Sequence, residues 1–412
     1  MSSSSVRLAD YAFLLLPVEG DSSTVVVEAP VDWSFEPTSL GDADFVVWGR
    51  VPFRSPPGWR QLLGHVYRRE KALRALSSGF GRLSPKRVHR LAPPPGPPGR
   101  IGARVRDFFL GGAAVELATA GSPDPVIEAV AREADIVLEW SSFSPGSDRA
   151  ATARGRRGPQ PVILRAGPTG TPSDPGGAAD ALETLEAAGI DRVPRVVARG
   201  QLGPVTYVGE SVLAGRRPRR VDGALITEVS SFLADLPRGN EVTGTLTDDL
   251  SVLATLLPEA RPEFERLDKE LRSALAAVPS VMTHGDLWAG NLFVHRGRLA
   301  GIIDWDGARR DGIPGTDLMH LVVSQRRHKA GGAIGAVWLK RPWRNEDFIG
   351  STADYWHSFG LRPNARLLDA VGAAWWAAWL RQALQRHERR LNDEDWLATN
   401  VTAVLDSLHV EA

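Results

Sequence analysis

The spacing of apolar residues changes partway along the chain. Between residues 125 and 215 they form short runs bounded by Gly, Pro, Ser and charged residues, which is typical of strands. Beyond residue 226 they recur at helical intervals. The sequence therefore predicts an α+β fold with a small sheet lobe, residues 125–215, and a helical lobe, residues 216–412. The expected strands of the first lobe are 136–140, 160–165 and 205–210, and its expected helices are 125–135 and 178–188.

Three strand-like runs and one run of helical spacing precede a proline-rich run at residues 92–99. Runs of Pro and Gly favour an extended linker or a long loop. We therefore expect a small α/β module in residues 1–92, and a linker and connector in residues 93–124. The expected elements of the module are strands at 11–18, 24–29 and 44–48 and a helix over 59–76.

A hairpin pattern interrupts the helical lobe. Its strand-like runs are 279–283, 291–294 and 298–304, with a turn at 295–297 between the last two. A hairpin of this kind places Asp286 and Asn291 on one loop. It also brings Asp304, at the end of the last strand, close to both.

The residues of this loop have the spacing of a phosphoryl-transfer site. His284 is followed after one residue by Asp286 and, after four more, by Asn291; Asp304 lies thirteen residues beyond. Kinase catalytic loops carry His, Asp and Asn at this spacing, with a separate metal-binding Asp. Such chemistry needs one carboxylate to orient a hydroxyl and receive its proton, and a second carboxylate with an amide oxygen to hold Mg²⁺. The alternative is a chance His-Gly-Asp sequence in a hairpin with surface carboxylates. Such a hairpin would have no reason to combine His, Asp and Asn at this spacing. We interpret His284 as a loop histidine that hydrogen-bonds the backbone.

These residues resemble the aminoglycoside phosphotransferase (APH) superfamily of small-molecule kinases, which has a protein-kinase-like fold and includes antibiotic, choline, homoserine and fructosamine kinases. The resemblance covers about the last two-thirds of the chain. It implies that ATP and Mg²⁺ are used, that Asp286 is the catalytic base, and that Asn291 and Asp304 hold the metal. It also implies that backbone groups at Glu210 and Val212 contact adenine.

A loop over the ATP phosphates is expected at residues 141–147. Its small residues, Ser144 and Gly146 among them, would expose backbone N–H groups to phosphate oxygens. A plain surface turn is the alternative.

The cation on the phosphates is expected to be Arg165. No Lys lies between residues 87 and 268, and an Arg can grip phosphates through its bidentate fork. Its expected acidic partner on the following helix is Glu183, with Glu186 as the alternative. A strand-end arginine in solvent is the competing interpretation of Arg165.

Composition narrows the functional classes. The formal net charge is zero and there are no cysteines, which excludes disulfides, thiolate zinc sites and cysteine nucleophiles. With no signal-peptide pattern and no apolar stretch of membrane-spanning length, we expect a cytoplasmic protein. Residues 50–106 hold fourteen Arg and Lys and one acid, Glu70. This segment is either a solvated basic face or a docking surface for an anionic partner, and it lacks motifs for sequence-specific nucleic-acid binding.

The acceptor is the least determined part of the function. A hydroxyl of a sugar or aminoglycoside-like polyol is the first hypothesis, and an amino alcohol of the choline or homoserine type is the second. A kinase-like binding or regulatory protein is the alternative from another class; the Arg in place of Lys favours it and the three catalytic-loop residues oppose it.

The helical lobe contains two further features. Leu368, Val371, Trp375 and Trp379 recur at helical spacing, with Trp376 and Leu380 alongside. Core packing is the first interpretation of this stripe, and a sugar-stacking platform is the second. Asp317 is expected to cap the next helix, and Asp306 to support the loop or the metal.

Overall fold

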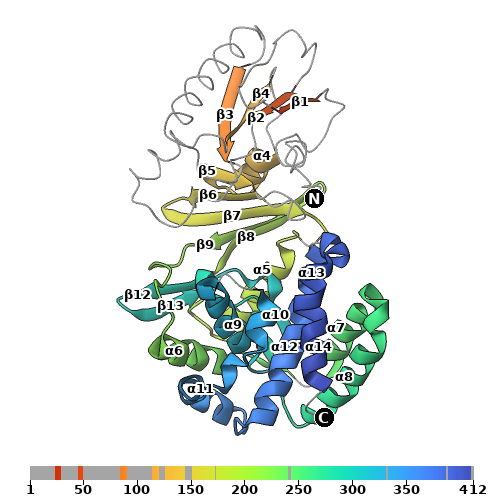
Figure 1. Ribbon diagram of the computed structural model, residues 1–412. Coiled ribbons are helices and arrows are strands. Elements are labelled where there is room, and N and C mark those ends of the chain that lie inside the picture. Colours follow the sequence, from red (N-terminus) through yellow and green to blue (C-terminus); the bar gives the residue numbers. More distant parts are fainter. Residues whose placement is uncertain are drawn as a thin grey trace, which may run out of the picture. The chain divides into compact units, whose positions relative to one another are not determined.

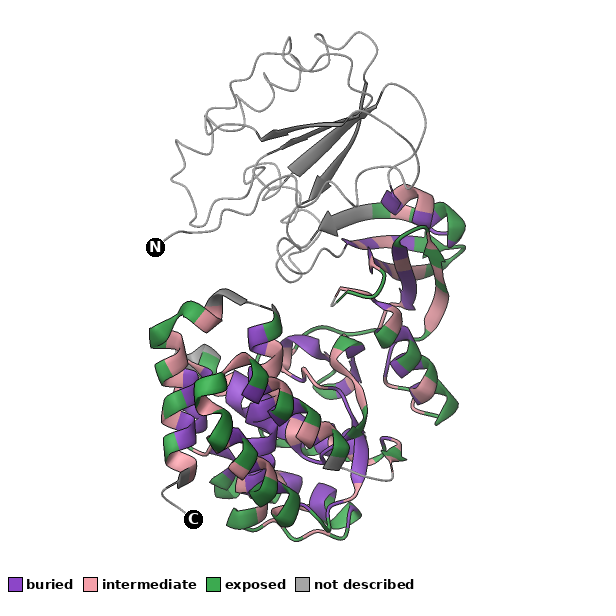
Figure 2. Ribbon diagram, turned by 90° about the vertical axis from the view of Figure 1, so that its right-hand side faces the viewer, coloured by how far each residue is buried: buried purple, intermediate pink, exposed green. Residues whose placement is uncertain are grey.

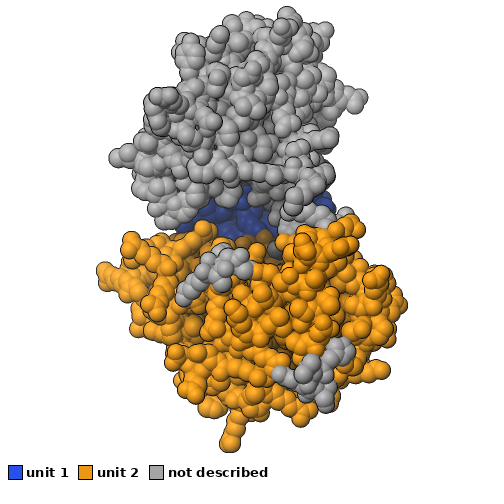
Figure 3. All heavy atoms as spheres, viewed as in Figure 1, with its two compact units in different colours: residues 1–176, 196–212 blue, residues 177–195, 213–412 orange. Residues whose placement is uncertain are grey.

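The chain forms two compact units in the computed structural model shown in Figures 1 and 3. Unit 1 comprises residues 1–176 and 196–212, and unit 2 comprises residues 177–195 and 213–412. The structure describes residues 24–28, 45–49, 84–90, 114–119, 126–143, 151–171, 173–239, 243–330, 333–386 and 388–409. The predicted elements at 11–18, 59–76 and 92–99, most of the basic segment 50–106, and both Ser144 and Gly146 lie outside the described residues.

Within the described ranges, the strands of unit 1 form one nine-stranded sheet in the order β1-β2-β4-β3-β5-β6-β7-β9-β8. Successive strands from β5 to β8 in this order pair antiparallel. Two parallel pairings occur, between β1 and β2 and between β3 and β5. The strands are β1 (Thr24–Glu28), β2 (Phe45–Gly49), β3 (Ser84–Arg90), β4 (Ala114–Thr119), β5 (Val137–Phe143), β6 (Ala151–Arg157), β7 (Gln160–Pro168), β8 (Val196–Leu202) and β9 (Val205–Ser211).

A small core forms between this sheet and helix α4 (Val126–Glu133). Ile127 and Val130 of α4 are fully buried and belong to the same cluster as Val162 and Leu164 of β7. Because side chains alternate across a strand, Arg165 projects from the sheet face opposite to Leu164. The sheet therefore separates its apolar core from the face that carries Arg165.

Unit 2 is mainly helical. Its strands β10 (Arg238–Gly239), β11 (Ser280–Thr283) and β14 (Arg309–Gly312) form a small sheet, and β12 (Leu292–His295) and β13 (Arg298–Ile302) form a hairpin. The helices are α5 (Gly176–Ala187), α6 (Gly223–Ala234), α7 (Thr243–Leu256), α8 (Arg261–Ala274), α9 (Thr316–Ala330), α10 (Ile334–Trp338), α11 (Glu346–Ser358), α12 (Ala365–Arg386), α13 (Glu394–Leu397) and α14 (Ala403–His409). Short 3₁₀ helices are η2 (Pro258–Ala260), η3 (Ala289–Asn291), η4 (Trp305–Gly307), η5 (Pro342–Arg344) and η6 (Glu388–Asn392), and η7 (Ala398–Thr402) is a π-helix.

Tryptophan side chains fill the core of unit 2, and Figure 2 shows its buried residues gathered where the helices face one another. Trp338 packs edge-on against Trp343 at 5.5 Å and donates through Nε1 to Gly372 O at 2.9 Å. A Cβ at Gly372 would lie 2.6 Å from the Trp343 ring, so only a glycine lets α12 approach this closely. The predicted stripe on α12 is confirmed as core packing at its buried positions, which are Leu368, Val371, Trp375, Trp376 and Leu380.

The predicted α+β class is confirmed, with a sheet-built unit and a helix-built unit as in protein-kinase-like folds. Strands 136–140, 160–165 and 205–210 and helix 178–188 have counterparts in β5, β7, β9 and α5. The predicted loop at 141–147 begins too early, because residues 141–143 continue β5. The domain boundaries proposed from the sequence stay a prediction. Among the described residues, no helix is both long enough and apolar enough to cross a membrane.

Strand β6 had no counterpart in the prediction. Its sequence, ATARGRR, has one β-branched residue, Thr152, and no aromatic residue, and its inward positions are filled by Ala151 and Ala153. A Cβ at Gly155 would lie 2.5 Å from Val137 O, so close pairing with β5 requires the small residue. The strand is set by its neighbours rather than by its own side chains.

Candidate active site

His284 anchors the loop that follows β11. Its Nε2 lies 2.9 Å from Ile303 O, and its Nδ1 accepts a hydrogen bond from the backbone N–H of Asp286 at 3.2 Å. Because Nδ1 accepts, Nε2 carries the hydrogen and donates to Ile303. The ring also lies 4.7 Å from that of Trp305. The predicted role of His284, bonding to the backbone, is confirmed.

Asp317 holds the same loop from α9. Its carboxylate accepts hydrogen bonds from the backbone N–H of His284 at 2.7 Å and of Gly285 at 2.9 Å. The prediction that Asp317 caps its own helix is wrong, because it lies in the first turn of α9 and bonds the distant loop instead. Burial raises the pKa of this carboxyl above its ordinary value of 3.8, although the His284 ring and the two N–H groups lower it.

Gly285 permits a tight crossing of two loops. Its φ is +80°, a left-handed conformation that favours glycine. A Cβ at this position would lie 2.0 Å from Gly307 O. The loop after β11 therefore packs directly on the turn after Asp304.

The hairpin β12–β13 brings the remaining candidate residues to this loop. Its strands pair from Leu292 opposite Ile302, and the backbone N–H of Ile303 donates to Asn291 O at 3.0 Å. Asn291 Nδ2 donates to Asp286 O at 2.9 Å, which leaves its amide oxygen outside that bond. Asp304 follows with φ +71°, a left-handed conformation that is uncommon outside glycine. Asp286, Asn291 and Asp304 thus come from one hydrogen-bonded set of loops, as the predicted hairpin requires.

The donor set suits a magnesium ion. Asn291 and Asp304 offer an amide oxygen and a carboxylate, the hard oxygen ligands that Mg²⁺ prefers, and phosphates usually complete such sites. In the described part of the chain, no cluster of three or more His, Cys, Asp or Glu side chains is placed to hold a metal. The oxygen donors of Asn291 and Asp304 fit such an ion.

His320 is a site residue that the sequence reasoning missed. Its Nε2 lies 3.4 Å from Asp286 Oδ1, and its ring packs against Trp375 at 5.7 Å. His320 lies one helical turn after Asp317 on α9, so both side chains project from one helix face. This spacing from Asp317 is the signal in the sequence by which His320 could have been found.

The nucleotide-binding candidates of unit 1 lie on β7 and β9. Arg165 NH1 lies 3.4 Å from Glu210 Oε1, with side chains 19% and 8% exposed. Glu210 is thus one acidic partner of Arg165, a contact that the prediction did not include, since it assigned only backbone to Glu210. Val212 follows β9 directly. Glu183 is an exposed residue of α5, and its pairing with Arg165 stays a prediction.

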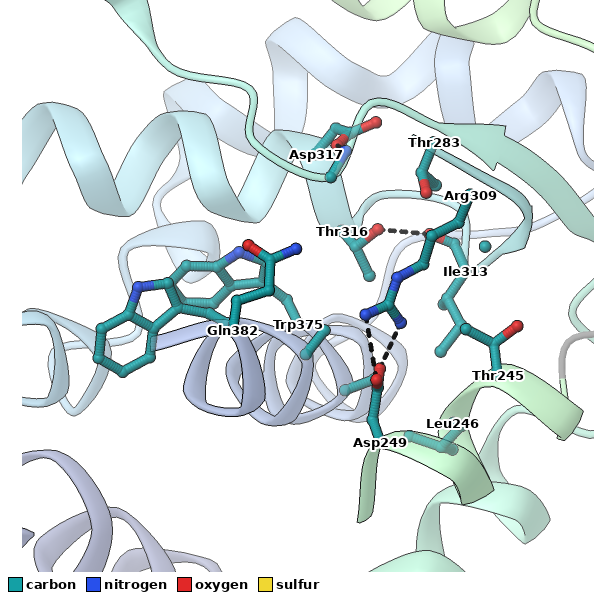
Figure 4. Close-up of a pocket in the computed structure, with 15 residues that line it drawn as sticks. Thr245, Leu246, Asp249, Thr283, Arg309, Ile313, Thr316, Asp317, Trp375 and Gln382 are labelled. Carbon is teal, nitrogen blue, oxygen red and sulfur yellow. Dashed lines mark hydrogen bonds and ion pairs between the residues drawn. The ribbon is translucent and has the colours of Figure 1, made fainter. Parts of the chain in front are cut away.

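A pocket in unit 2 adjoins the catalytic loop (Figure 4). It has an open volume of about 490 Å³, part of it open to solvent. Figure 4 shows Arg309 reaching to Asp249 on one side, with Trp375 and Gln382 on the other. Its lining residues come from β11 and the next loop (Thr283, Gly285), β14 and α9 (Arg309, Gly312, Ile313, Thr316, Asp317), α7 (Thr245, Leu246, Asp249) and α12 (Ala374, Trp375, Ala378, Trp379, Gln382).

Residues 139–346, half of the chain, match the model of a phosphotransferase enzyme family. No curated protein matches the chain closely enough to count as a relative.

Solved structures similar to the chain are kinases of small molecules. One is a macrolide 2'-phosphotransferase from Brachybacterium faecium, with 19% identity and a TM-score of 0.43 over 67% of this chain and 98% of that one. Another is a putative fructosamine-3-kinase from Haemophilus somnus, with 10% identity and a TM-score of 0.46 over 66% of this chain and 92% of that one. A third, from Streptomyces rimosus, is an aminoglycoside phosphotransferase in complex with ADP and streptomycin, with 17% identity and a TM-score of 0.38 over 56% of this chain and 93% of that one. Similarities this low decide nothing about the substrate.

Proposed function

Because the chain belongs to the phosphotransferase enzyme family and is a small-molecule kinase with a hydroxyl acceptor, we propose that it transfers the γ-phosphoryl group of ATP to a hydroxyl of a sugar or aminoglycoside-like polyol. The observation that supports this most is the bonded loop of Asp286, Asn291 and Ile303. A loop tied by its own backbone holds its carboxylate in one place before the substrate arrives, which is what catalysis by positioning needs.

Asp286 acts as the base. Its carboxylate orients the acceptor hydroxyl and receives the proton while the hydroxyl oxygen bonds to the γ-phosphorus. The bond between the γ-phosphorus and the oxygen that bridges to the β-phosphate breaks, and ADP leaves with that electron pair. Aligned geometry of this kind can supply roughly 7–11 kcal/mol of the barrier.

Asn291 and Asp304 would hold Mg²⁺ through the amide oxygen and the carboxylate. When bound, the ion neutralises charge on the phosphate oxygens. The Asn291 side chain is already oriented by its bond to Asp286 O, so the metal ligand and the base are fixed by one contact. The left-handed backbone of Asp304 sets the direction of the second ligand.

Unit 1 supplies the nucleotide contacts. Arg165 neutralises charge on the phosphates, and its bond to Glu210 supports this role by holding the guanidinium on the face of the sheet opposite α4. Backbone groups of Glu210 and Val212 contact adenine.

The variant Asp286→Asn tests the base. It keeps the shape of the side chain and removes the proton acceptor, so phosphate transfer should fall by roughly 10²–10⁴-fold while ATP binding changes little. ADP formation with a panel of sugars and polyols measures the first, and calorimetric titration with ATP the second. Asp354→Asn, an exposed residue of α11, is the matched control and should behave as the wild type. Near-normal turnover of Asp286→Asn would refute the assignment.

A further inference from the structure

The proposed function leaves open which acceptor is used. We propose that the pocket between α7, α12 and β14 binds the acceptor, and that it takes a hydroxylated ring with an anionic substituent rather than a polyamine. That the bound molecule is the acceptor rests on the proposed function; its chemical class follows from the charges and surfaces of the pocket.

The pocket adjoins the residues that would do the chemistry. Thr283 and Gly285, on either side of His284, line it, as does Asp317, which holds the loop. Trp375 lines it as well and contacts His320, whose Nε2 lies 3.4 Å from Asp286 Oδ1. A molecule seated there lies one side chain away from the base.

An aromatic wall gives the pocket its affinity for a ring. Trp375 and Trp379 stack on α12 with centroids 6.4 Å apart and planes 28° from parallel, and both line the pocket. Flat indole surfaces suit the apolar face of a sugar ring. Trp379 is half-buried and so retains accessible surface, whereas Trp375 is buried. The second interpretation of this stripe, a platform for stacking a sugar, therefore applies to Trp379.

A cluster of two guanidinium groups and one carboxylate lies at the pocket. Arg309 forms two hydrogen bonds with Asp249, at 2.5 and 3.0 Å, and Arg381 NH1 donates to Asp249 Oδ1 at 2.7 Å. Asp249 is 2% exposed, and among the described residues it is the one acid bonded to either arginine. The cluster therefore has a net charge of plus one, and its two arginine side chains are 22% and 29% exposed, so an anion can reach them. An anion is the partner that such a cluster lacks.

The carboxylates of the pocket are already in use. Asp249 binds two arginines, and Asp317 accepts two backbone N–H groups. Both are nearly inaccessible, at 2% and 4% exposure. A polyamine would find a guanidinium and no accessible carboxylate, and like charges disfavour binding.

A polar group suited to hydroxyls lines the same wall. Gln382 lies on α12 with Trp375 and Trp379 and offers both a donor and an acceptor. A hydroxylated ring can hydrogen-bond this amide, whereas an apolar ligand would leave it without a partner in the pocket.

The test is a direct binding measurement without ATP. Saturation-transfer NMR with glucose, glucosamine, glucuronate and glucose 6-phosphate presents one ring with a neutral, cationic, carboxylate or phosphate group. We expect the carboxylate or the phosphate sugar to bind about tenfold more tightly than glucose and glucosamine, since hydrogen bonds between charged partners are the stronger ones. The two anionic probes distinguish the sources of charge. Equal binding of all four, tighter binding of glucosamine, or binding of none would overturn the proposal.

Arg381→Gln locates the effect. Arg381 does not line the pocket, and its loss leaves Asp249 paired with Arg309 as a neutral pair. The preference for the anionic sugar should disappear, with binding of glucose unchanged. Arg366→Gln removes the same charge from an exposed position on the same helix and should keep the preference. A preference that survives in Arg381→Gln would contradict the charge argument.

Failure of this inference and of the proposed function can be told apart. If anionic sugars bind as expected and no acceptor is phosphorylated, the pocket stands and the proposed reaction fails. If an amino sugar is phosphorylated with the same kinetics by the wild type and by Arg381→Gln, the proposed function is supported and the inference about the pocket is wrong.

Discussion

His320 Nε2 lies 3.4 Å from Oδ1 of Asp286, so a buried imidazole ring contacts one carboxylate oxygen of the proposed base. His320 comes from α9 and Asp286 from the loop after β11, so the contact links the helix that holds the loop to the residue that the loop carries.

This contact predicts a positioning role for His320. His320→Ala should lower kcat by roughly 10–100-fold with little change in the KM for ATP, because the base loses its orientation. His320→Gln retains an N–H donor and should recover part of the rate. Steady-state kinetics of both variants, with melting temperatures, measure the effect. If Ala and Gln behave alike at equal stability, His320 serves the fold and not the base.

Gly285 should tolerate no side chain. Gly285→Ala places a Cβ 2.0 Å from Gly307 O and also forces an alanine to φ +80°, so the loop must move and phosphate transfer should be lost. Gly297→Ala is the matched control: its φ is +82°, with nothing within 4 Å of the added Cβ. It should cost only the left-handed strain, roughly 1–2 kcal/mol, and keep activity. Urea unfolding and turnover of the two variants separate the clash from the strain, and equal losses in both would contradict it.

Asp317 should make stability depend on pH. Its folded-state pKa is raised by burial above 3.8, so its contribution to the free energy of unfolding is fully present below that value and falls as the pH rises through the raised pKa. Asp317→Asn removes this part of the slope. It also leaves one backbone N–H of the loop without an acceptor, which should cost roughly 1–3 kcal/mol. Urea unfolding of both proteins between pH 4 and pH 8 is the measurement, and parallel curves would exclude the assignment.

Arg165 should act on the nucleotide alone. Arg165→Gln removes the charge and should raise the KM for ATP by about tenfold or more, because charge-assisted bonds to phosphate are lost. Arg165→Lys keeps the charge, and its KM for ATP should lie between those of the wild type and of Arg165→Gln. The KM for the acceptor, measured in the same assays, should not change. A raised acceptor KM with a normal ATP KM would contradict the role.

The spacing of residues along the chain determined the hairpin that carries the candidate site residues. His284, Asp286 and Asn291 lie within eight residues, and a short turn joins the strands that return to Asp304, so local geometry alone brings them together. The order of a strand-rich segment followed by a helix-rich segment was also predicted from the sequence, because the periodicity of apolar residues indicates how each segment is buried.

Contacts between distant segments could not be read in the same way. Asp249 meets Arg309 and Arg381, which lie 60 and 132 residues away. Asp317 was expected to cap its helix, and His320 was not singled out, because each bonds a loop more than thirty residues earlier in the chain. Strand β6 exists because its neighbours pair with it on both sides. Local sequence decides which groups are offered, whereas the packing of helices and strands decides which of them meet, and that depends on the shape of the whole core.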